Sequence, residues 1–68
     1  MIEEYYTTTV NAKDWDDCER ITAIARSLPS YHRIYVEDVA VFDLHGDQYT
    51  IEVYFIDEQD VTMFHLKI

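Results

Sequence analysis

Residues 11–28 read NAKDWDDCERITAIARSL and carry the clearest periodic pattern in the chain. Asn11 is a residue type that caps helices, and Asp14, three residues later, is placed to reach back to that cap. Acidic side chains crowd the first turns and arginines follow, which suits the helix dipole. The stretch predicts one amphipathic helix that ends at Leu28-Pro29, since a residue before proline leaves helical geometry. Its expected apolar face consists of Trp15, Cys18, Ile21, Thr22, Ala25 and Leu28.

A strand is expected on the N-terminal side of this helix, over residues 2–10. Tyrosines and three consecutive threonines favour extended backbone there. Because side chains alternate along a strand, Ile2, Tyr6 and Val10 share one side and Tyr5 lies on the other.

The chain after the helix is expected to form strands only. Apolar alternation runs through residues 34–44, but a straight strand would turn Asp38 into the core, where an unpaired carboxylate is costly. A bulge or turn is therefore expected at Glu37-Asp38, and Gly46-Asp47 is typical of a hairpin turn. The remaining expected elements are strands over residues 49–55 and 61–68, with a polar turn at 57–60.

These patterns predict a single compact α+β domain over residues 1–68. The expected order is β-α-β-β-β, with one more strand if the bulge divides residues 34–44. A single helix would pack on one face of an antiparallel sheet of four to five strands. The other face would stay open to water unless something covers it.

Net charge limits the classes of partner. Fourteen acidic residues against five basic ones give a net charge of −9 in 68 residues. Direct binding to a nucleic-acid backbone or to an anionic membrane would bring like charges together. Basic proteins and metal ions are the partners that such a field attracts. A simpler explanation of the net charge is that it keeps the chain soluble, but solubility alone does not need a charge of this size.

The chain is expected to be cytoplasmic. Its apolar runs fall well short of the roughly 20 residues that cross a bilayer, and its first residues, MIEE, are acidic where a secretory signal would be basic. A single cysteine excludes an internal disulfide and fits a reducing compartment.

The sequence contains residue types that can serve in catalysis or metal binding, but their neighbours give little support for either role. Cys18 is expected to be a buried structural thiol among aspartates, which oppose thiolate formation. The sequence has no glycine-rich phosphate loop and no Gly-x-Ser-x-Gly elbow, so we expect neither an enzyme nor a cofactor. Asp43, His45 and Asp47 alternate at an expected strand end, and a metal-binding domain that uses them stays as an alternative.

The strongest functional pattern lies on the face of the sheet away from the helix. That face is expected to carry Glu3, Tyr5, Thr7, Tyr35, Glu37, Glu52, Tyr54, Met63 and His65. Tyrosine and methionine are enriched in protein interfaces, although cross-strand tyrosine pairs also steady a sheet. The residues expected to bind a partner are Tyr5, Tyr35, Glu37, Glu52 and Tyr54, with Asp14, Asp16 and Asp17 as a second acidic patch.

Together these features predict an inhibitor or regulator that docks on a basic surface of a partner protein. If that surface is a nucleic-acid channel, the chain would block it or mimic nucleic acid, as would suit a phage protein that opposes CRISPR or restriction machinery. The alternative is a homo-oligomeric accessory subunit, including a homodimer, or an antitoxin-like neutraliser of a basic toxin. In that case the open face, or an edge strand ending at Ile68, would be buried.

Overall fold

The fold comes from a computed structural model, which describes residues 4–39, 46 and 48–68. These residues form strands and helices in the order β-α-β-β-α. The elements are β1 (Tyr6–Ala12), α1 (Trp15–Arg26), β2 (Tyr31–Asp38), β3 (Tyr49–Phe55) and α2 (Glu58–Lys67). Neither helix is long and apolar enough to cross a membrane.

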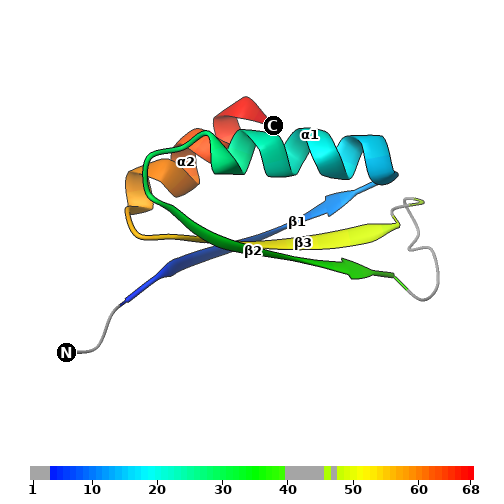
Figure 1. The fold of residues 1–68 in the computed structure, drawn as a ribbon, viewed down its shortest axis with the longest axis horizontal. Coiled ribbons are helices and arrows are strands. Elements are labelled where there is room, and N and C mark those ends of the chain that lie inside the picture. The colour runs from blue at the N-terminus through cyan, green and yellow to red at the C-terminus, as the bar shows by residue number, and fades with distance from the viewer. Residues whose placement is uncertain (1–3, 40–45, 47) are drawn as a thin grey trace.

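The three strands form one antiparallel sheet in the order β1-β3-β2. The outer strands β1 and β2 both run antiparallel to β3, so they are parallel to each other and α1 connects them across the sheet. This arrangement is a split β-α-β unit, in which the third strand inserts between the first two. Figure 1 shows the central position of β3 below the helices.

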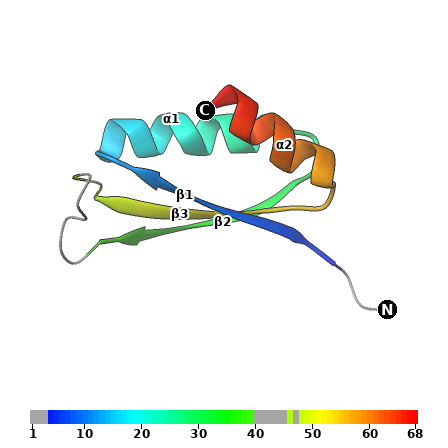
Figure 2. The ribbon, with the colours of Figure 1, turned by 180° about the vertical axis from the view of Figure 1, so that it is seen from behind.

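Both helices pack on the same face of the sheet, as Figures 1 and 2 show from opposite sides. The buried core lies between these two layers. It consists of Ala12, Cys18, Ile21, Ala25, Leu28, Ile51, Val53, Phe55 and Phe64. The opposite face of the sheet is covered by none of the described elements.

The prediction of a single helix on a four- to five-stranded sheet is wrong, because the described residues form three strands and two helices. The largest error concerns the C-terminal segment, which was expected to be a strand and is α2. The Asp57 side chain caps this helix by accepting a hydrogen bond from the backbone N–H of Gln59 at 2.9 Å. Phe64 is fully buried, with its ring centroid 5.7 Å from that of Phe55.

The start of α1 also differs from the prediction. β1 continues through Asn11 to Ala12, and Asp14 is the N-cap instead, accepting a hydrogen bond from the backbone N–H of Asp17 at 2.8 Å. Trp15 was expected in the apolar face but is 54% exposed, and in the first turn of α1 its ring meets the edge of the sheet at Tyr49, with centroids 5.5 Å apart. Its indole Nε1 donates to Glu19 at 2.8 Å.

The expected bulge at Glu37-Asp38 is absent from β2, which continues regularly to Asp38. Asp38 needs no bulge because it lies at the exposed end of the strand. The register shift falls between Tyr31 and Arg33, so His32 is the extra residue. Gly46 has a φ of 78°, a conformation that glycine adopts without steric cost. The strand expected over residues 40–44 lies outside the described residues.

Candidate binding face of the sheet

The sheet register gathers one row of side chains from each strand on the face away from the helices. Ile51, Val53 and Phe55 of β3 are buried against the helices, so Thr50, Glu52 and Tyr54 point to the other side. Residues directly opposite in an antiparallel pair share a face. We call this surface the open face, and it consists of Tyr5, Thr7, Thr9, Asn11, His32, Arg33, Tyr35, Glu37, Thr50, Glu52 and Tyr54.

The five expected partner-binding residues of the sheet lie together on the open face. These are Tyr5, Tyr35, Glu37, Glu52 and Tyr54. Met63 and His65 were also expected there, but both belong to α2 in the helical layer. The His65 Nε2 lies 2.6 Å from the Thr8 Oγ1, on the helix side of β1. Glu3 lies outside the described residues.

An arginine stands at the centre of the tyrosines. The Arg33 guanidinium carbon lies 4.5 Å from the ring centroid of Tyr54, 5.4 Å from that of Tyr35 and 5.9 Å from that of Tyr5. Each such cation–π contact contributes about 0.5–1 kcal/mol at an exposed site. Tyr5 also stacks on His32, with centroids 4.3 Å apart and planes at 14°. We call these five residues the Arg33 cluster.

Sequence reasoning missed Arg33, although a signal was present. Arg33 has the same parity as Tyr35, so alternation along the strand already placed both on one face. His32 reaches the same face for a different reason, since the register shift between Tyr31 and Arg33 makes it the extra residue and its ring stacks on that of Tyr5. No pattern in the sequence indicated that shift.

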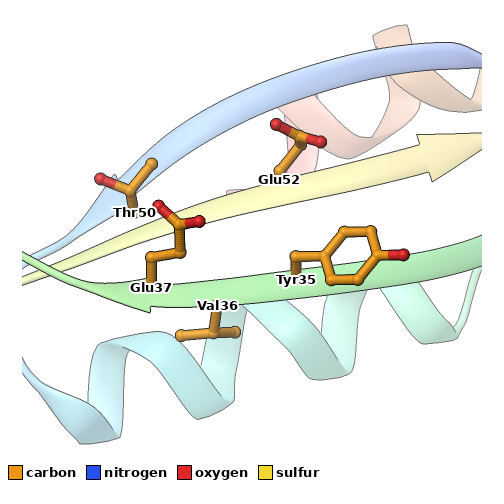
Figure 3. Close-up of a pocket in the computed structure, with 5 residues that line it drawn as sticks. All are labelled: Tyr35, Val36, Glu37, Thr50 and Glu52. Carbon is orange, nitrogen blue, oxygen red and sulfur yellow. The ribbon is translucent and has the colours of Figure 1, made fainter.

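A pocket of about 400 Å³ lies next to the Arg33 cluster, between β2 and β3. It is lined by Tyr35, Val36, Glu37, Thr50 and Glu52. Figure 3 shows Glu37, Thr50 and Glu52 rising from the same side of the sheet, while Val36 points away from them. The pocket therefore combines two carboxylates, a hydroxyl and an aromatic ring.

The two carboxylates of the pocket have different surroundings. Glu52 accepts a hydrogen bond from the hydroxyl of Tyr54. That bond raises the pKa of the Tyr54 phenol, helped by partial burial and by the negative charge of Glu52, while the Arg33 charge acts in the opposite direction. Within the described part of the chain, neither Glu37 nor Glu52 forms an ion pair. Both therefore keep charge available for a cation from outside.

The second expected patch lies apart from the open face, at the start of α1. Asp14 caps the helix, and Asp17 accepts a hydrogen bond from the Arg20 guanidinium at 2.7 Å. This bond is the main cause that lowers the pKa of Asp17. Two of the three aspartates thus stabilise the helix itself, and Asp16 stays exposed.

Cys18 and the alternative metal site complete the candidates. Cys18 is buried in the core, where burial first and the charges of Glu19 and Asp17 next raise the pKa of its thiol. The expected metal ligands Asp43, His45 and Asp47 lie outside the described residues. Elsewhere, in residues 4–39, 46 and 48–68, no group of three or more His, Cys, Asp or Glu side chains is arranged to hold a metal ion.

Comparisons of this chain with protein-family models, with curated proteins and with solved structures gave no match.

Proposed function

We propose that this protein is a non-catalytic inhibitor or regulator whose open face docks on a basic surface of a partner protein. The observation that carries the proposal is the composition of the open face. Exposed or half-buried tyrosines, one arginine and two carboxylates share a sheet surface that no described element covers. Tyrosine and arginine are among the residue types enriched in the few positions that dominate binding energy at protein interfaces.

The pocket supplies the anchor of this interaction, and an arginine side chain of the partner is its occupant. A guanidinium placed between Glu37 and Glu52 meets two carboxylates and can lie against the ring of Tyr35. Arginine suits this environment better than lysine, because its planar group stacks on aromatic rings and donates in a fork to carboxylates. The Arg33 cluster then provides buried area beside the anchor.

Net charge adds to this local complementarity. A chain of net charge −9 attracts a cationic surface over a long range and speeds association with it. The aspartates at the start of α1 contribute to this field without touching the partner. A nucleic-acid channel is one basic surface of this kind, and a chain docked there would exclude nucleic acid. A cytoplasmic location is part of this proposal. A nucleic-acid-binding partner is found there, and a free cysteine such as Cys18 fits a reducing compartment.

Capture experiments with matched variants test the proposal. The open-face variant carries Glu37→Gln and Glu52→Gln, and the control carries Asp16→Asn and Glu58→Gln in the helical layer. Each removes two negative charges from the total of −9, so a difference between them reports location and not net charge. We expect immobilised wild type and control to retain the same cytoplasmic protein, and the open-face variant to lose it. Circular dichroism checks that both variants fold.

Retention of that protein by the open-face variant, or equal loss with both variants, contradicts the proposal. The salt dependence provides a second criterion, because docking on a basic surface must weaken as salt rises. Addition of excess DNA or RNA to the captured complex distinguishes the type of surface. Displacement by nucleic acid assigns a nucleic-acid channel, and unchanged binding assigns another basic surface.

A further inference from the structure

Within the part of the chain that the structure describes, the outer edge of β1 directs backbone groups away from the sheet, where no strand pairs with them. The carbonyl of Ala12 accepts a hydrogen bond from the backbone N–H of Gln48 at 3.0 Å, so even-numbered residues of β1 bond toward β3. Backbone groups of successive strand residues point to alternate sides. Thr7, Thr9 and Asn11 therefore present their N–H and C=O groups to the edge, where no other described strand pairs with β1.

This edge lacks the features with which proteins protect edge strands. Charged residues, prolines and bulges commonly prevent an edge from pairing with another chain. Residues 5–12 read YYTTTVNA, without charge or proline, and β1 pairs with β3 in an uninterrupted register. The opposite edge, β2, is protected by a bulge and by charge. It contains the register shift at His32 and the charged residues Arg33, Glu37 and Asp38.

The distribution of charge along the sequence makes this edge the place where two copies can meet. Charged residues make up 28% of the sequence, and their sum of −9 makes two copies repel each other over most of their surfaces. The eight neutral residues 5–12 are where two copies approach at the lowest electrostatic cost. An edge strand is self-complementary in geometry, because an antiparallel pair of identical strands has a twofold axis and closes as a dimer.

We propose that two copies of this chain pair β1 with β1 in antiparallel orientation. The twofold axis then runs perpendicular to the sheet, and the two three-stranded sheets join into one of six strands. Both helical layers lie on one side of the joined sheet, and both open faces lie on the other. Dimerisation therefore leaves the pockets accessible and places two of them on one continuous surface. Pairing through β1 is independent of what binds to the open faces.

Sedimentation equilibrium over a range of protein concentrations tests this dimer, with Thr9→Pro and Thr9→Val as paired variants. Proline removes the outward N–H of Thr9, which a solvent-facing edge tolerates in a monomer but an added strand does not. Valine keeps the N–H and favours a strand. We expect wild type and Thr9→Val to dimerise, and Thr9→Pro to stay monomeric with unchanged helix content.

Amide hydrogen exchange on the wild type decides the question even if Thr9→Pro fails to fold. The amides of Thr7, Thr9 and Asn11 must become more protected as protein concentration rises. Added salt must strengthen the dimer, because it screens the repulsion between two anionic copies, whereas it weakens docking on a basic partner. A wild type that stays monomeric at millimolar concentration overturns the inference. A dimer in which the newly protected amides lie outside β1 also overturns it. The same holds if the β1 amides become protected only when a different protein is added, and not when the concentration of this chain rises.

Discussion

A hydrogen bond between Glu52 and Tyr54 connects the pocket with the Arg33 cluster. The Tyr54 ring belongs to the Arg33 cluster, and its hydroxyl donates to a carboxylate of the pocket. The protonated phenol is the donor in this bond, so the neighbouring carboxylate favours it over the phenolate. The pKa of Tyr54 is consequently raised above its ordinary value of 10.0.

Replacement of Glu52 measures this coupling. The variant Glu52→Gln removes the charge and weakens the acceptor, so we expect the pKa of Tyr54 to fall back toward 10.0. NMR of the Tyr54 ring carbon across alkaline pH follows this single tyrosine among the six in the chain. Glu37→Gln is the control and leaves the Tyr54 titration unchanged. Identical Tyr54 curves for wild type and Glu52→Gln would show that the hydroxyl is not bonded to Glu52.

The second helix is the feature that local sequence did not reveal. Residues 61–68 satisfy two patterns, because Thr62, Phe64 and Leu66 alternate while Val61, Phe64 and Ile68 recur at helical spacing. β-branched and aromatic residues favoured the strand. In the helix Phe64 is buried against Phe55, a contact between two elements that the pattern within residues 61–68 does not contain. By contrast, α1 was predictable because its acidic start and periodic face agree.

Substitutions in α2 test this helix by its energetics. Loss of an N-cap side chain costs about 0.5–2 kcal/mol, so we expect Asp57→Ala to lower the free energy of unfolding by about 1 kcal/mol. Phe64→Ala leaves a cavity and costs about 3–5 kcal/mol, which is a large share of the stability of so small a domain. Chemical denaturation followed by circular dichroism measures both. Glu58→Ala, one residue beyond the cap, is the control and changes stability by less than Asp57→Ala.

If residues 58–67 formed a strand instead, Asp57 would be an ordinary turn residue. Asp57→Ala and Glu58→Ala would then destabilise the chain equally, and that result would contradict the assignment of α2.

The prediction of the open face succeeded where it depended on alternation within one strand. Parity alone placed Glu52 and Tyr54 on the same side of β3, and the structure places them there. It failed for Met63 and His65, because their positions followed from a strand that does not exist. Strand order could not be predicted from the sequence either, so nothing in it indicated that Glu37 and Glu52 line one pocket between β2 and β3.

At the scale of the whole molecule, the two layers carry different tasks. The helical layer buries the core against one side of the sheet, and its aspartates cap and brace α1. The open face contributes none of the fully buried core side chains, so its tyrosines and carboxylates can change without loss of the core. This separation makes the binding proposal testable with variants that keep the fold.

Titration of the isotopically labelled chain with a hexa-arginine peptide, followed by NMR, tests the central claim most directly. We predict that the largest shifts occur at the pocket residues Tyr35, Glu37, Thr50 and Glu52. The same pattern persists in the Asp16→Asn and Glu58→Gln control and disappears in the Glu37→Gln and Glu52→Gln variant. Shifts that centre on the start of α1, or that spread evenly over the acidic residues, would contradict the account.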